Sequence, residues 1–289
     1  MLIHYCETNV LIVYQKKGGF TMIVFSFINL KGGVGKTTVS TNVAIELMQR
    51  GLRVLFIDND EQSNSSFFFN VDKKEKTLAT LYKNPQIDIR DVIYSTTYDN
   101  IDCIPAGYDL DIILTLYFDR EKFKGMDRTS VLKNKLQTVS NDYDVCIIDN
   151  HPGINVATYN GLMATNSVII VTTTDYYAEQ GLKAMIKELE NVKKDRMNYD
   201  EDYDEGIRTK SIRLEGCLIN KYINNPDFHK KRQYNYFNTN IRMVVKNKLY
   251  LFDSAVKQHK SLIEIAPYIN FSKDIRKFTS ELLDKILKE

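Results

Sequence analysis

Residues 29–38 read "NLKGGVGKTT", and they join an apolar run of strand length to a segment of helix length. Glycines in such a loop let the backbone wrap closely around phosphate oxygens, with successive N–H groups directed inward. A lysine and a hydroxyl residue at the end of the loop are placed to reach the β and γ phosphates and Mg²⁺. The stretch therefore predicts a phosphate-binding loop. Its residues are Lys31, Gly32, Gly33, Val34, Gly35, Lys36, Thr37 and Thr38.

Apolar runs of strand length alternate with helix-length segments along most of the chain. The strand-like runs occupy residues 21–30, 53–60, 144–150, 167–174 and 213–220. Such continuous apolar runs indicate strands that are buried on both faces, as in a parallel sheet. The sequence therefore predicts a doubly wound α/β fold, in which a mostly parallel sheet is flanked by helices on both faces.

The first 21 residues differ from the rest of the chain. Met22 opens the first strand-like run directly before the glycine-rich loop, which makes it a candidate translation start. We therefore expect one domain over residues 22–289, preceded by an extension over residues 1–21. Alternatively, residues 10–14 add an edge strand to the sheet.

The composition is that of a globular protein, and its net charge does not predict a particular class of partner. The 289 residues include 39 Lys and Arg against 37 Asp and Glu, for a net charge of +2. No apolar run approaches the ~20 residues of a membrane span. The cysteines have no spacing typical of zinc or iron-sulfur ligands, so we expect reduced thiols in a cytoplasmic protein without membrane attachment. They are Cys6, Cys103, Cys146 and Cys217.

Three carboxylates stand at or just beyond the ends of strand-like runs. The apolar part of the run 53–60 ends at Asp58, Asp60 follows two residues later, and the apolar part of the run 144–150 ends at Asp149. Carboxylates at the carboxyl ends of parallel strands point into the crevice where ligands bind in open α/β sheets. We therefore predict that Asp149 anchors the waters of a Mg²⁺ ion ligated by Thr37, with Asp58 as a further candidate ligand. Asp60 is predicted to orient an attacking water.

The motif "KGGVGKTT" resembles the deviant phosphate loop of the ParA/MinD ATPases, in which Lys31 replaces the need for a leading glycine. "LFIDNDEQSN" and "YDVCIIDNHPG" resemble two further motifs of ParA-type partition proteins, and the likeness extends from Met22 to the C-terminus. The resemblance implies a dimer that sandwiches two ATP molecules. It also implies that Lys31 reaches across to the phosphates of the partner subunit in a catalytic role, and that Asn220 contacts adenine.

The chain departs from the family pattern at two places. Glu61 stands where the family usually has proline, and Asn150 and His151 replace the residues before Pro152. These departures leave the predicted ATP site intact, but the family's rate of hydrolysis does not transfer directly to this chain. His151 is open to two interpretations, a sensor of the γ-phosphate or a structural residue, and the structural role is favoured.

A basic segment without acidic residues spans 228–248, and one-signed clusters of this kind suit contacts to a phosphate backbone. An ordinary solvated helix face is the alternative interpretation. We predict nonspecific DNA binding by Lys230, Lys231, Arg232, Arg242, Lys246 and Lys248.

Two predictions concern the elements around this basic segment. A helix over residues 179–197 is expected to precede a solvated acidic loop over 200–206. The amphipathic stretch 272–289 is expected to pack as a final helix rather than to bind a membrane.

The resemblance implies an ATPase that uses ATP and Mg²⁺ to segregate a plasmid or a related mobile element. It implies slow hydrolysis, an ATP-bound homodimer on nonspecific DNA of the nucleoid, and stimulation by a centromere-binding ParB-like adaptor. The alternative is a MinD-like membrane-associated positioning ATPase. A polysaccharide-export tyrosine kinase is disfavoured because the chain lacks a terminal tyrosine cluster, and an iron-sulfur reductase because it lacks paired cysteines.

Overall fold

The computed structural model describes residues 22–110, 129–174, 176–202, 212–221, 241 and 250–287. Its centre is a seven-stranded sheet in the order β3-β4-β2-β5-β1-β6-β7. Every neighbouring pair is parallel except β3 and β4, which are antiparallel. The predicted fold class is therefore confirmed. The strands are β1 Ile23–Ile28, β2 Val54–Asn59, β3 Tyr94–Ser95, β4 Ile101–Ile104, β5 Val145–Asn150, β6 Ser167–Thr172 and β7 Arg213–Ile219.

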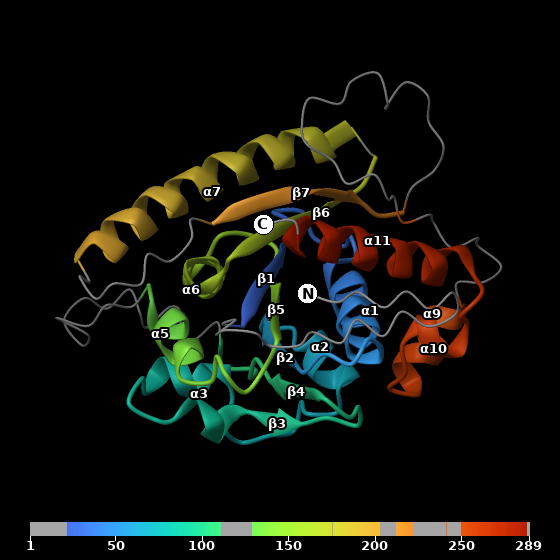
Figure 1. Ribbon diagram of the computed structural model, residues 1–289, viewed down its shortest axis with the longest axis horizontal. Coiled ribbons are helices and arrows are strands. Elements are labelled where there is room, and N and C mark those ends of the chain that lie inside the picture. The colour runs from blue at the N-terminus through green and yellow to red at the C-terminus, as the bar shows by residue number, and fades with distance from the viewer. Residues whose placement is uncertain are drawn as a thin grey trace.

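Helices cover both faces of this sheet (Figure 1). One face packs against α1, α9, α10 and α11, and the other against α3, α5, α6 and α7. The helices are α1 Lys36–Gln49, α2 Asn64–Phe68, α3 Leu78–Lys83, a 3-10 turn Ile89–Val92, α5 Val131–Gln137, α6 Val156–Ala164, α7 Tyr176–Asp202, α9 Tyr250–Lys257, α10 Leu262–Ile265 and α11 Asn270–Leu287.

The core explains why the long apolar runs become interior strands. In β2 and β5 every residue is buried, because each strand has neighbours on both sides and helices above and below. Phe27, Phe56 and Ile147 have no exposed surface. Burial of such side chains is the dominant favourable contribution to folding, at about 1.5–3 kcal/mol for each.

The final helix packs as predicted over its described part. Ile275, Phe278 and Leu282 recur on one side of α11 and have no exposed surface. Arg50, which follows α1, donates from Nη2 to the carbonyl oxygen of Arg276 at 3.0 Å and so joins the two helices. None of the helices in the described part of the chain is long and apolar enough to cross a membrane.

The prediction for the acidic stretch 200–206 was wrong at its beginning. Helix α7 continues to Asp202, so the first three residues of the stretch are helical. The physical reason is that no glycine or proline interrupts the chain between Gly181 and Gly206.

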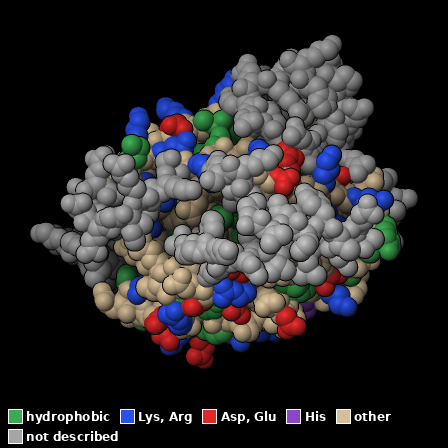
Figure 2. Space-filling view, viewed as in Figure 1, with side chains coloured by type: hydrophobic (Ala, Val, Ile, Leu, Met, Phe, Trp, Pro, Cys, Tyr) green, Lys and Arg blue, Asp and Glu red, His purple; other side chains and the backbone are tan. Residues whose placement is uncertain are grey.

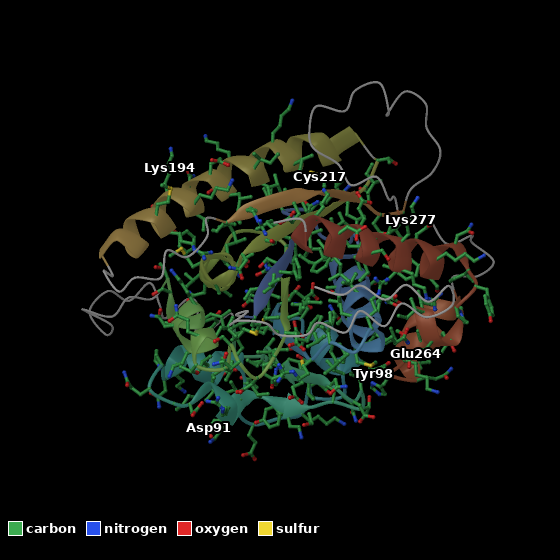
Figure 3. All side chains as sticks on the ribbon, viewed as in Figure 1. Asp91, Tyr98, Lys194, Cys217, Glu264 and Lys277 are labelled. Atoms are coloured by element: carbon green, nitrogen blue, oxygen red, sulfur yellow. The ribbon has the colours of Figure 1, made fainter. Side chains whose placement is uncertain are left out.

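The antiparallel edge of the sheet is tied to the helices near the C-terminus. Tyr98, between β3 and β4, donates its hydroxyl to Glu264 Oε2 at 2.8 Å (Figure 3). Burial and the Glu264 carboxylate raise the pKa of Tyr98 far above its ordinary value.

Over the described residues on the face drawn in Figure 2, acidic and basic side chains are interspersed.

Candidate nucleotide site

The phosphate loop begins at the end of β1 and leads directly into α1. Asn29 fixes its first turn, because Nδ2 donates to the Val171 carbonyl oxygen at 2.6 Å and Oδ1 accepts the Lys31 N–H at 2.9 Å. Gly35 caps α1 without a side-chain hydrogen bond. The first N–H groups of the helix are therefore open to an anion, and the helix dipole favours its negative charge.

Two of the loop glycines adopt backbone conformations that favour glycine. Gly33 has φ of 71° and Gly35 has φ of 91°, both in the left-handed region. A Cβ on Gly35 would lie 2.3 Å from Asn220 Nδ2, whereas a Cβ on Gly33 would meet nothing within 4 Å. Gly35 is therefore required both by the backbone and by a close neighbour.

Asn220 and Lys221, just after β7, hold the loop from outside. Asn220 Nδ2 donates to the Val34 carbonyl oxygen at 2.8 Å, and Lys221 Nζ donates to the Gly33 carbonyl oxygen at 2.7 Å. We call these two contacts the β7 clasp. It draws two loop carbonyls toward β7. The contact of Asn220 with adenine, which the sequence indicated, stays a prediction. The sequence did not predict the β7 clasp.

Lys36 and Asp149 face each other at the base of the loop. Burial lowers the pKa of Lys36, while the nearby carboxylates of Asp149 and Asp60 act in the opposite direction. Burial raises the pKa of Asp149 to about 7 and the Asp58 carboxyl adds to the rise, whereas Thr37 and Lys36 oppose it. Neither buried Asp149 oxygen has a hydrogen bond of ordinary geometry within the described part of the chain.

An unsatisfied buried carboxylate beside a threonine hydroxyl fits a magnesium site. Burying such a group without partners is costly, and a cation with its waters would supply the missing contacts. Thr37 and Asp149 are therefore the residues that could hold Mg²⁺ here, and this role stays a prediction. The glycine loop beside them has the open N–H groups that a nucleotide phosphate requires.

Asp58 occupies the position in β2 that Asp149 occupies in β5, since the two are paired in the sheet. Its Oδ2 accepts the Ser66 N–H at 2.7 Å and the Ser66 hydroxyl at 2.6 Å. Burial raises the pKa of Asp58 to about 6, and the bonds from Ser66 limit the rise. These contacts assign Asp58 to holding α2 in place. Its role as a metal ligand stays a prediction.

Asp60 lies one residue beyond β2 and is partly exposed. Its N–H donates to Asp58 Oδ1 at 3.3 Å, and its Oδ1 accepts the Gln62 N–H at 3.0 Å. Its carboxylate acts on Lys36, which places Asp60 at the same crevice as the loop. The role of Asp60 with water stays a prediction.

Glu61 and His151, two of the residues that depart from the family pattern, contact each other. His151 Nε2 and Glu61 Oε1 are 2.9 Å apart, and the side chains are 26% and 21% exposed. With Asp60 they bring three ligand atoms within 4.8 Å of one another, an arrangement that a cation could also use. The contact with Glu61 supports a structural role for His151.

The remaining predicted residues are those expected to contact a second copy of the chain or DNA. Lys31 lies half-buried on the loop, and its role toward a second copy of the chain stays a prediction. The six predicted DNA contacts, from Lys230 to Lys248, lie outside the described residues.

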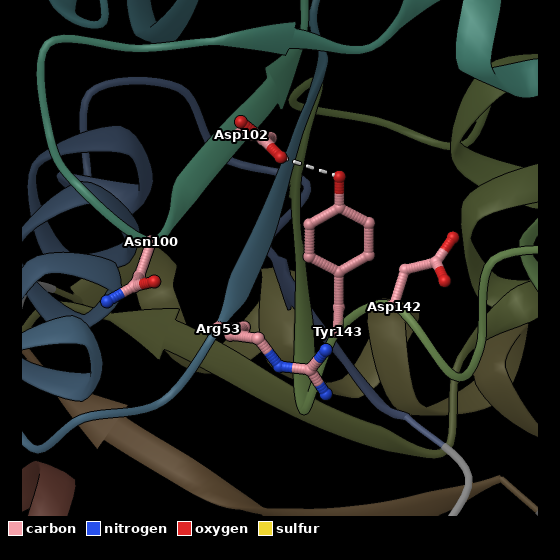
Figure 4. Close-up of a pocket in the computed structure, with 5 residues that line it drawn as sticks. All are labelled: Arg53, Asn100, Asp102, Asp142 and Tyr143. Carbon is pink, nitrogen blue, oxygen red and sulfur yellow. Dashed lines mark hydrogen bonds between the residues drawn. The ribbon is translucent and has the colours of Figure 1, made fainter.

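A pocket at the opposite end of the sheet is unrelated to the phosphate loop (Figure 4). It has a volume of about 280 Å³ and lies where β2, β4 and β5 begin. Tyr143 donates to Asp102 there at 2.8 Å, and Arg53 pairs with Asp144 at 3.0 Å. Its charged groups are therefore largely used within the fold.

Comparisons with known proteins agree with this geometry. A family model described as an AAA domain matches residues 22–201. The sporulation initiation inhibitor protein Soj of Bacillus subtilis (strain 168) is 33% identical over 203 residues, or 68% of this chain and 71% of Soj. The chromosome-partitioning ATPase Soj of Treponema pallidum (strain Nichols) is 33% identical over 166 residues, or 57% of this chain and 63% of that protein.

Two solved structures share the fold. Apo McdA of Cyanothece has a TM-score of 0.72 and 21% identity, with 90% of this chain and 99% of McdA covered. The cell division ATPase MinD of Pyrococcus furiosus has a TM-score of 0.66 and 18% identity, with 91% and 98% covered. Together with the family match and the similarity to Soj, the phosphate loop establishes that the chain belongs to the ParA/MinD superfamily of P-loop ATPases.

Proposed function

We propose that this chain is a ParA-type partition ATPase that uses ATP and Mg²⁺ to segregate a plasmid or a related mobile element. The observation that carries the proposal is the unsatisfied, buried Asp149 carboxylate beside Thr37 and Lys36 at the base of the glycine loop. The partition role is supported by the similarity to Soj of Treponema pallidum, a chromosome-partitioning ATPase. A structural neighbour, cobyrinic acid a,c-diamide synthase of Mycobacterium smegmatis, was solved with an ATP analog and magnesium.

Each residue of the site has a part in this activity. The N–H groups of the loop and of the first turn of α1 bind the phosphates, and the Lys36 ammonium neutralises their charge. Thr37, and Asp149 through water, would hold Mg²⁺, which would further neutralise the phosphate oxygens. Asp60 orients the attacking water. The β7 clasp keeps two loop carbonyls directed away from the phosphates.

The proposed cycle needs a second copy of the chain. Two ATP-bound copies join with their nucleotides between them, and Lys31 of each copy contacts the phosphates held by the other, as an arginine finger does. The dimer binds nonspecific DNA of the nucleoid through the basic segment 228–248. A centromere-binding ParB-like adaptor then stimulates slow hydrolysis and release.

Light scattering with Mg²⁺ and a slowly hydrolysed ATP analog tests the dimer. We expect the wild-type chain to double its mass, the Lys31→Ala variant to bind nucleotide as a monomer, and the Lys36→Ala variant to lose nucleotide binding. A wild-type chain that stays monomeric at saturating nucleotide would refute the proposal.

Cosedimentation separates partition from the alternative, a MinD-like membrane-associated positioning ATPase. Partition predicts ATP-dependent pelleting with plain DNA and no pelleting with anionic liposomes. The reverse result would establish the alternative. The apolar side of α11 packs into the core through Ile275 and Phe278, which favours partition.

A further inference from the structure

Side-chain and main-chain contacts link the ends of β2 and β5 and the loops that follow these strands. The sheet register pairs Asn59 with Asn150 as the last residues of the two strands. Asn59 Nδ2 donates to Asn150 Oδ1 at 2.8 Å, and both side chains are fully buried. The His151 N–H then donates to the Asn59 carbonyl oxygen at 3.2 Å.

The Glu61–His151 contact is the outermost of these links. It joins the residue directly after Asp60 to the residue two positions after Asp149, at 2.9 Å. We call the amide pair, the main-chain bond and the Glu61–His151 contact together the β2–β5 strap. The strap thus joins the two loops at three points.

The strap also reaches the phosphate loop. A Cβ on Gly32 would lie 4.0 Å from Pro152 Cγ, so the loop after β5 lies against the glycines. Within the described part of the chain, the Asp60 carboxylate accepts a hydrogen bond from the Gln62 N–H, which is two residues away. The Asp60 main chain donates to Asp58 Oδ1 at 3.3 Å and accepts the Ser63 N–H at 2.9 Å. The contact made by Glu61, the next residue, is therefore a further restraint on the position of Asp60 near Lys36.

We propose that Glu61 and His151 are positioning residues for hydrolysis, and that their contact holds Asp60 over the phosphate loop. The inference rests on the proposed function, in which Asp60 orients the attacking water. Loss of the contact lets the Asp60 loop sample unproductive positions, which slows the chemical step. The nucleotide is bound by the phosphate loop and Lys36, so its affinity does not depend on the contact.

Single-turnover hydrolysis of Mg²⁺-ATP and the binding of a fluorescent ATP analog test this on the full-length chain. The variants are Glu61→Gln, His151→Gln, the double variant, and the charge exchange Glu61→His with His151→Glu. Glu190→Gln is the matched control, because Glu190 pairs with Lys193 on α7 at the same 2.9 Å. The interaction energy of a partly exposed pair of this kind is about 1 kcal/mol. Loss of this energy from the transition state would make hydrolysis about fivefold slower in each single variant.

The expected pattern is specific. Both single variants and the double variant slow hydrolysis by the same factor, analog affinity changes less than about twofold, and the charge exchange restores the rate. The inference is overturned if the two single effects multiply in the double variant, if the control slows hydrolysis as much, or if affinity falls with the rate.

Asp60→Asn distinguishes this inference from the proposed function. Normal hydrolysis by Asp60→Asn would refute the role of Asp60, and the inference with it. Inactive Asp60→Asn together with normal rates in the pair variants would overturn the inference alone.

Discussion

Replacing Gly35 with alanine tests how the β7 clasp shapes the phosphate loop. The new Cβ would lie 2.3 Å from Asn220 Nδ2 and 3.6 Å from Asn220 Cγ, so the Asn220 amide must move. Its buried hydrogen bond to the Val34 carbonyl oxygen would then be lost. Leaving such a buried group unsatisfied costs about 1–3 kcal/mol. The left-handed backbone at Gly35 adds about 1–2 kcal/mol for any residue with a Cβ.

Gly33→Ala separates these two contributions. Its backbone is also left-handed, but its Cβ would meet nothing within 4 Å. Gly33→Ala should therefore lower the free energy of unfolding by about 1–2 kcal/mol, and Gly35→Ala by about 2–5 kcal/mol. Chemical denaturation of the nucleotide-free protein, followed by circular dichroism, measures both values.

Removing the neighbour should remove the difference. In an Asn220→Ala background the added Cβ at position 35 has space, so Gly35→Ala should cost no more than Gly33→Ala. The reasoning is refuted if Gly35→Ala and Gly33→Ala are equally destabilising in the wild-type chain. It is also refuted if the larger cost of Gly35→Ala persists without the Asn220 amide.

Three further predictions follow from burial. Asp149→Asn should stabilise the protein without nucleotide or Mg²⁺ at pH 8 by about 1–3 kcal/mol. Because the pKa of Asp149 is raised, the folded wild-type chain binds this proton more tightly than the unfolded chain does. The free energy of unfolding should therefore fall as pH rises from about 4 through about 7. Denaturant titrations at pH 4 and pH 7 measure the direction of this change. Burial raises the pKa of the Cys103, Cys146 and Cys217 thiols, so alkylation at pH 8 should modify them only after unfolding, as peptide mass spectrometry would show. Phe278→Ala should cost about 3–5 kcal/mol in the same denaturation assay, and Phe278→Leu less.

The sequence predicted the interior of the sheet because long apolar runs have few alternatives to a buried strand. All five predicted strands occur, as β1, β2, β5, β6 and β7. Strands β3 and β4 went unpredicted, since they have only two and four residues, and β3 is an edge strand. Runs this short carry too little periodicity to distinguish a strand from a loop.

Contacts between distant segments were beyond a reading of local motifs. The sequence marked Glu61 and His151 as departures from the family pattern, but their contact joins residues that only the register of β2 and β5 brings together. The β7 clasp is a similar case, because Asn220 bonds to a carbonyl 186 residues earlier in the chain. Such contacts depend on the order of the strands in the sheet, which neither segment predicts by itself.

Asp58 and Asp149 show why a motif does not determine a role. Each lies one residue before the end of its strand, and the sheet pairs them directly. Asp58 is satisfied by Ser66 of α2, which follows β2 after a short loop, whereas the described residues give the Asp149 oxygens no hydrogen bond of ordinary geometry. A carboxylate already bonded within the fold holds structure, whereas one left unsatisfied at a phosphate loop has contacts to offer a cation. The difference comes from the neighbouring helix rather than from the aspartates, and it favours Asp149 over Asp58 for the predicted role of metal anchor.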